Sequence, residues 1–113
     1  MNILYIAYSC NPFAGSEDKI GWCVPYESSK KNKVYVITKE EQREPVEKYL
    51  QSHPLENIKF YYVDIPNSYK KILKGFMYSG RLNVWNKRVL PLAKKICADQ
   101  KIDVIHQITP IEF

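Results

Sequence analysis

The sequence predicts an α/β fold built on a doubly wound parallel sheet, and three observations support this prediction. Short apolar runs rich in β-branched and aromatic residues recur at residues 3–8, 33–38, 58–65 and 103–108. Segments with helical periodicity separate these runs, as the crossovers between parallel strands require. The first run is almost continuously apolar, which is typical of a strand covered on both faces. Together these patterns predict a β-α-β-α-β-αα-β order with right-handed crossovers.

The first crossover is expected to be a helix over residues 17–31. Ser16 is a good N-cap, and Glu17 and Asp18 then lie in the first turn, where the helix dipole favours acidic side chains. Pro25 is expected to kink or shorten this helix.

The second half of the chain shows the same alternation of strands and helices. Residues 40–52 predict a short amphipathic helix, and residues 68–79 are expected to be helical until Gly80 ends that helix. The helix before the last strand is predicted by apolar residues that recur at spacings of three and four, namely Leu82, Trp85, Val89, Leu92 and Ile96.

The expected spatial order of the four strands is 3-2-1-4, in a single Rossmann-like domain that spans residues 1–113 as a three-layer sandwich. In this order the first and fourth strands are neighbours whose crossovers leave in opposite directions. The crevice at their carboxyl ends is then the switch point where ligands bind. This strand order brings residues 9–16 beside residues 106–109. It also leaves the fourth strand at a bare edge of the sheet, and a homodimer that pairs through this edge is one alternative.

Composition limits the classes of protein that fit. A hydrophobic share of 45% and a charged share of 26% are typical of a folded globular domain. Cys10, Cys23 and Cys97 are odd in number and lack a CxxC pair, so neither a disulfide framework nor a metal site is expected. The apolar start has no basic residue before it and is far shorter than a membrane span, so a cytoplasmic protein is expected, with peripheral membrane contact as an option.

The net charge of +5 is unevenly distributed. No acidic residue lies between Asp64 and Asp99, and this block contains Lys70, Lys71, Lys74, Arg81, Lys87, Arg88, Lys94 and Lys95. Such a block favours contact with an anionic surface, and interleaved aromatic residues suit a membrane interface, although a solvated helix with aromatics in the core explains both. No RNA-binding motif is present, so nucleic acid is the weakest alternative.

Three residues near the predicted switch point are suited to ligand binding or catalysis. Gly15 precedes a helix start, where backbone N–H groups could face a diphosphate, although a tight turn equally explains a glycine there. Glu17 is the best-placed carboxylate for a general base or hydroxyl acceptor, with helix capping as the alternative. His106 suits donation to a substrate oxygen or proton transfer near neutral pH, and a histidine satisfied in the core or rim is the alternative.

Several motifs carry a resemblance to a known family. They are Asn11-Pro12, Gly15-Ser16-Glu17 and Gly21-Trp22 near the start, and Asp103-Val104-Ile105-His106 with Thr109-Pro110 at the far end. With these motifs the chain resembles, over essentially its whole length, the N-terminal domain of the family-4 (group 1) retaining glycosyltransferases of the GT-B fold.

The resemblance implies a hexosyltransferase that moves a sugar from a nucleotide-sugar donor to a polysaccharide or lipid-linked acceptor. It implies retention at the anomeric carbon and no required metal or other cofactor. Carried over by position, Gly15 and Ser16 would border the donor diphosphate, Glu17 would lie near the acceptor, and His106 would lie beside the transferred sugar.

Members of this family continue into a C-terminal donor-binding domain, for which 113 residues leave no room. We therefore interpret the chain as the acceptor-side domain of a larger two-domain enzyme, which by itself is expected to bind donor weakly and to be inactive. The alternative is a non-catalytic binding module whose basic helical segment, residues 68–98, meets a membrane, an anionic glycan or a partner protein.

Overall fold

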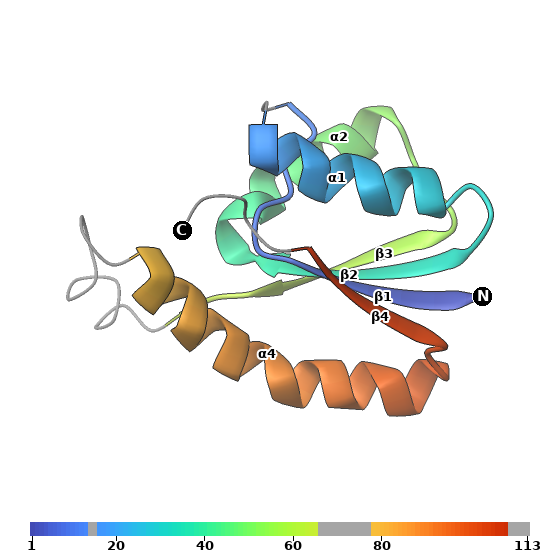
Figure 1. Ribbon diagram of the computed structural model, residues 1–113. Coiled ribbons are helices and arrows are strands. Elements are labelled where there is room, and N and C mark those ends of the chain that lie inside the picture. The colour runs from blue at the N-terminus through green and yellow to red at the C-terminus, as the bar shows by residue number, and fades with distance from the viewer. Residues whose placement is uncertain (14–15, 66–77, 109–113) are drawn as a thin grey trace.

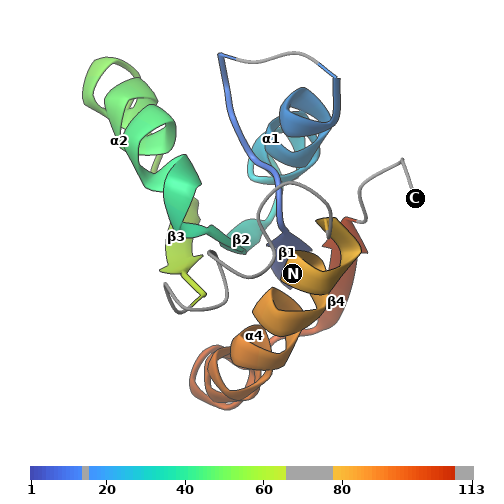
Figure 2. The same cartoon turned by 90° about the vertical axis from the view of Figure 1, so that its left-hand side faces the viewer.

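Helices cover both faces of a central sheet in this protein (Figure 1). The computed structural model describes residues 1–13, 16–65 and 78–108, and the side chains of residues 16–18 and 78–83 lie outside this description. In Figures 1 and 2, α1 and α2 lie on one face of the sheet and α4 lies on the other. The three-layer arrangement predicted from the sequence is confirmed.

The sheet has four strands in the order β3-β2-β1-β4, and each neighbouring pair is parallel. This is the predicted order. The parallel pairing is explained by the helices between the strands, because a parallel neighbour needs a crossover that returns over one face of the sheet. The strands span Asn2–Ala7 (β1), Lys33–Lys39 (β2), Ile58–Val63 (β3) and Val104–Ile108 (β4).

The first two crossovers match the predicted helices, with different ends. They contain α1 (Ser16–Ser28), a 3-10 turn η1 (Glu40–Gln42) and α2 (Arg43–Ser52). The sequence analysis extended the first helix to residue 31. In the structure it ends earlier, where the Ser29 hydroxyl donates to the Tyr26 carbonyl at 2.7 Å and the chain turns into β2. A serine hydroxyl that satisfies a helix carbonyl in this way competes with the next helical turn.

The third crossover contains α4 (Tyr78–Gln100). The prediction that Gly80 ends a helix is wrong, because α4 runs through it. One glycine inside a helix costs about 1 kcal/mol, and α4 offsets that cost by burying Trp85, Val89 and Ile96. Most of the helix predicted over residues 68–79 lies outside the described residues.

Each face of the sheet has its own core. On the α4 face, Leu4 and Ile37 pack with Trp85 and Val89. On the α1 and α2 face, the buried cluster comprises Tyr5, Ala7, Cys10, Trp22, Val34, Val36 and Val46. Alternate residues of β1 belong to opposite cores, as the two-residue period of a strand requires. The nearly continuous apolar sequence of β1 is explained by this double burial.

Candidate functional site

The carboxyl ends of β1 and β4 meet at one edge of the sheet. Ala7, the last residue of β1, pairs with Ile108, the last residue of β4. Figure 1 shows that α1 begins at the same edge, so the loop after β1 lies at a helix N-terminus. The crossovers from β1 and into β4 lie on opposite faces of the sheet, which makes this edge the switch point of the fold.

Gly21 allows α1 to pack closely against the loop that follows β1. An added Cβ at this position would lie 1.7 Å from the Ser9 carbonyl oxygen and 2.9 Å from the Ser9 carbonyl carbon. Real carbon atoms do not approach so closely, and both contacts are with backbone, which cannot move aside as a side chain would. Only glycine therefore permits this packing, and the next residue, Trp22, is buried in the adjacent core.

The loop itself is held by local hydrogen bonds as far as Phe13. Asn11 Oδ1 accepts a hydrogen bond from the Phe13 backbone N–H at 2.9 Å, which is an Asx-turn. Lys19 Nζ on α1 donates to the Pro12 carbonyl at 3.2 Å. Cys10 and Pro12, which belong to this loop, are buried. These contacts tie the loop both to itself and to α1.

His106 lies on β4, opposite Tyr5, and not at the very end of the strand. Its ring centroid is 5.4 Å from that of Tyr5, with the planes tilted by 38°. Because Tyr5 belongs to the core on the α1 and α2 face, His106 lies on that face too. Its side chain is exposed, so its imidazole is accessible to a ligand. The structure thus leaves two residues, Gln107 and Ile108, between His106 and the edge.

The other predicted site residues are described less fully. Gly15 lies outside the described residues, and so do the side chains of Ser16 and Glu17. The backbone of Ser16 and Glu17 forms the start of α1, at the edge where β1 ends. The expected roles of all three toward a diphosphate and an acceptor remain predictions.

The sequence analysis missed two residues, Tyr8 just after β1 and Lys39 at the end of β2. Lys39 Nζ lies 4.6 Å from the centre of the Tyr8 ring, a cation–π contact at the switch-point edge. The sequence alone does not single out a lysine at the end of an apolar strand. The cation of Lys39 contacts Tyr8, which lies 31 positions earlier in the chain.

Gln42 is a third residue that sequence reasoning missed. It lies in η1, directly after β2, and its side chain is buried. Its Oε1 makes no hydrogen bond in the part of the chain that the structure describes. A buried acceptor without a partner costs stability.

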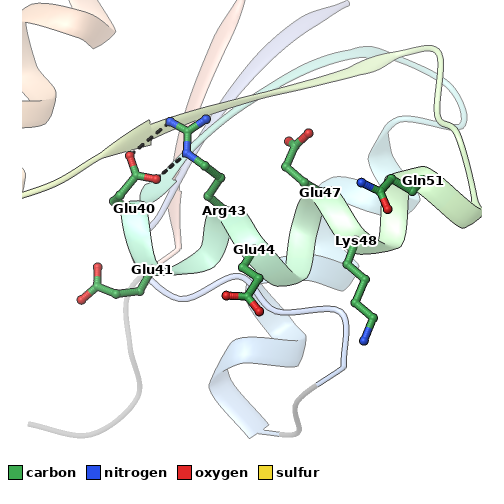
Figure 3. A pocket seen from close by; sticks show the side chains of 7 residues that line it. All are labelled: Glu40, Glu41, Arg43, Glu44, Glu47, Lys48 and Gln51. Carbon is green, nitrogen blue, oxygen red and sulfur yellow. Dashed lines mark hydrogen bonds and ion pairs between the residues drawn. The ribbon is translucent and has the colours of Figure 1, made fainter.

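A separate groove of about 530 Å³ runs along η1 and α2. Figure 3 shows its lining, in which Arg43 pairs with Glu40, and the other lining side chains are Glu41, Glu44, Glu47, Lys48 and Gln51. Four carboxylates repel an anionic donor, so this groove does not fit a nucleotide diphosphate. Nor do the described residues include any group of three or more metal-ligating side chains.

One tyrosine beside this groove has a strongly shifted pKa. Burial raises the pKa of Tyr62 well above its ordinary value, and the hydrogen bond to Glu47 at 2.7 Å raises it further. The Arg43 guanidinium lies 4.4 Å from the centre of the same ring and only partly opposes this shift. Tyr62 is therefore a structural hydrogen-bond donor, since a phenol with such a pKa keeps its proton at neutral pH.

Within the described residues, no helix combines the length and the apolar character that crossing a membrane needs. Comparisons of the chain with protein-family models, with curated proteins and with solved structures find no match. Any functional assignment therefore rests on the residues and geometry of this chain.

Proposed function

We propose that this chain is the acceptor-side domain of a retaining glycosyltransferase, which moves a sugar from a nucleotide-sugar donor to a polysaccharide or lipid-linked acceptor. The observation that carries the proposal is the switch point, where the loop after β1 and the end of β4 meet at the N-terminus of α1. Ligands of doubly wound sheets bind at such an edge. A helix N-terminus there also favours an anionic diphosphate.

Two motif residues of the resemblance, Gly21 and His106, support the proposal. Gly21 allows α1 to touch the Ser9 carbonyl, and this contact sets where the helix begins relative to β1. His106 presents an exposed imidazole on the same side of the sheet as α1. An imidazole can donate a hydrogen bond to a sugar hydroxyl, which fits a group beside a transferred sugar.

The proposed division of labour leaves donor binding mainly to a second domain. We expect the chain alone to bind a nucleotide sugar weakly, with a dissociation constant in the millimolar range, and to show no turnover. Sugar transfer is expected only when a donor-binding domain of the same family is joined to it. Without such a domain the chain would supply one wall of the cleft.

Titration of the isotope-labelled chain with uridine diphosphate and uridine diphosphate glucose, followed by NMR, tests this proposal. Amide shifts confined to residues 9–17 and 106–108 would support it, because the described parts of these segments lie at the carboxyl ends of β1 and β4 and at the start of α1. His106→Ala should reduce the response to the sugar nucleotide more than the response to the nucleotide alone. Shifts spread over α2 or α4, or no shifts with any of several nucleotide sugars at 10 mM or so, would contradict it.

A second function is favoured by the exposed charge of α4. Lys87, Arg88, Lys94 and Lys95 are all exposed, while Trp85 on the opposite side of the helix is buried. A cationic helix face of this kind suits a membrane surface, an anionic glycan or an acidic partner. Lys70, Lys71 and Lys74, whose charge reversal is expected to abolish binding to anionic vesicles, lie outside the described residues.

A further inference from the structure

A second pocket lies at the opposite end of the sheet from the switch point. It has a volume of about 220 Å³ and lies at the amino ends of β2 and β3, where the last residue of α4 also reaches. In Figure 1 this end of the sheet is on the right, beside the N-terminus. The residues that line the pocket belong to the described part of the chain, and those with polar side chains are Lys33, Tyr35, Glu56, Asn57, Lys59 and Gln100.

Two lysines on neighbouring strands line this pocket from the same face of the sheet. Lys59 pairs with Tyr35 in the register of β2 and β3, so the two side chains share a face. Lys33 lies two residues before Tyr35 on β2 and therefore lies on that face as well. Tyr35 belongs to the core on the α4 face. The two ammonium groups are thus carried by diagonal neighbours on the face that α4 covers.

Tyr35 and Gln100 form a fixed polar pair in the lining. Tyr35 is 6% exposed, and its hydroxyl donates to Gln100 Oε1 at 3.1 Å. The backbone carbonyl of Gln100 accepts a hydrogen bond from Asn2 Nδ2 at 2.8 Å, so this residue is held through both its backbone and its side chain. Within the described residues, Gln100 Nε2 donates to no acceptor. This amide N–H is therefore available to a ligand.

The two lysines have no carboxylate partner in the part of the chain that the structure describes. Both side chains are exposed, and the two ion pairs found there join other residues. Lys59 Nζ lies 5.2 Å from the centre of the Tyr61 ring, which does not neutralise its charge. Like charges at neighbouring positions on one face of a sheet repel each other. An anion between Lys33 and Lys59 would replace this repulsion with two attractive contacts.

The rest of the lining limits the kind of anion. Glu56 also lines the pocket, and the carboxyl end of α4 carries partial negative charge. A polyanion is therefore disfavoured, whereas hydroxyl groups, which donate hydrogen bonds to a carboxylate, suit this side of the pocket. A volume of about 220 Å³ corresponds to about seven water molecules at roughly 30 Å³ each. This is enough room for one phosphate joined to a short polyol.

We propose that this pocket binds a small phosphate ester that carries free hydroxyl groups. Its phosphate would lie between Lys33 and Lys59, because lysine binds phosphate as a point charge without a fixed geometry. Its hydroxyls would donate to Glu56 and accept a hydrogen bond from Gln100 Nε2. The site lies at the opposite end of the strands from the switch point. Its ligand is therefore distinct from the nucleotide sugar and the acceptor of the proposed function.

NMR titration of the isotope-labelled chain with glycerol 3-phosphate tests the proposal. We expect saturable amide shifts at residues 33–35, 56–59 and 100, with a dissociation constant below about 5 mM. Inorganic phosphate should shift the same amides and bind at least about threefold more weakly, because it lacks the hydroxyl groups. Glycerol should cause no shifts. Uridine diphosphate is the reference for the switch point, where amides of residues 9–17 report on the proposed function separately.

Single charge changes test whether the attraction comes from this pocket. Lys33→Gln and Lys59→Gln should each weaken the binding of glycerol 3-phosphate at least about threefold, and the double variant should abolish it. Glu56→Gln removes the nearby negative charge and should tighten the binding of inorganic phosphate. Lys31→Gln is the matched control, because it removes an exposed lysine of the preceding turn that does not line the pocket. It should leave the dissociation constant within about twofold.

Three results would overturn the proposal. One is a loss of binding in Lys31→Gln as large as that in Lys33→Gln, which would trace the attraction to the overall charge of the chain. Another is a set of shifts that the double variant retains. The third is a response to glycerol 3-phosphate that does not saturate by about 20 mM.

Discussion

Gly21 has no freedom to change, because its α-carbon faces the backbone of the loop after β1. In Gly21→Ala the new methyl carbon would clash with the Ser9 carbonyl oxygen, now 1.7 Å from the ideal Cβ position. Either α1 or the loop must move, and we expect a loss of more than about 2 kcal/mol in the free energy of unfolding. Urea denaturation measures this loss.

Ile20→Ala is the matched control for that substitution. It changes the neighbouring residue on the same helix, where the side chain is 43% exposed, and should cost less than about 1 kcal/mol. Equal effects of the two substitutions would contradict the close contact at Gly21. Loss of nucleotide-sugar binding in a folded Gly21→Ala would further tie this contact to the proposed site.

Tyr62 couples the stability of the protein to alkaline pH. Burial, followed by the hydrogen bond to Glu47, raises its pKa in the folded state above the ordinary value of 10.0. The folded chain therefore keeps this proton while the unfolded chain releases it. The contribution is fully present below about pH 10 and is lost as the pH rises further.

Tyr62→Phe removes this titration and should flatten the alkaline part of the stability curve. We expect the unaltered protein to lose more unfolding free energy than the variant between about pH 9 and 11. Urea unfolding at several pH values gives both curves, and phenolate absorbance reports ionisation in the folded state. Parallel curves would show that Tyr62 is not the coupled group.

At the scale of elements, α4 is anchored by Trp85. Its indole is 1% exposed, and Nε1 donates to the Val63 carbonyl at the end of β3 at 2.9 Å. Trp85→Phe would leave that carbonyl without its donor and open a small cavity, and should cost about 2 to 3 kcal/mol in unfolding free energy. Leu90→Ala, on the exposed side of α4, should cost much less. Thermal or urea unfolding compares the two variants.

The elements were predictable where one periodic face decides their conformation. Trp85, Val89 and Ile96 recur at helical spacing and are buried together, as predicted. The boundaries were less predictable, because they depend on local hydrogen bonds such as that of Ser29 and on tertiary burial that outweighs the cost of Gly80. Helix propensity depends on residues within one turn, whereas burial of the apolar face stabilises the helix as a whole.

At the scale of the whole molecule, the described helices on the two faces of the sheet differ in charge. Acidic side chains gather on η1 and α2, as Figure 3 shows, and exposed basic residues lie along α4 on the other face. A membrane or polyanion would therefore meet the α4 face. We expect the chain to co-sediment with vesicles that contain about 30% phosphatidylserine and not with neutral vesicles, with binding that weakens as salt rises.

Two fourfold charge reversals test the role of α4 in this binding. One changes Lys87, Arg88, Lys94 and Lys95 to glutamate and should abolish co-sedimentation. The other alters the same number of charges at exposed lysines elsewhere, namely Lys30, Lys31, Lys33 and Lys48. It should reduce binding far less, because those lysines are not on α4. Equal loss in both variants would mean that only net charge matters.

The candidate site was predictable in position and not in detail. Strand order follows from the sequence pattern, so the meeting of the ends of β1 and β4 was expected and is found. The register was not predictable, and it sets His106 opposite Tyr5. Register depends on contacts between residues about 100 positions apart, and nothing local encodes it.

The sequence by itself determined the α/β class, the four strands and the buried face of α4, because each follows from periodicity within a short segment. The strand order was predicted from the alternation of strands and helices along the whole chain. Only the tertiary structure decided the contact of Gly21 with Ser9, the pairing of Tyr62 with Glu47 and the exposure of β4. These features join side chains and backbone across the fold. Their energies exist only once the sheet and helices have packed, so no pattern in one segment records them.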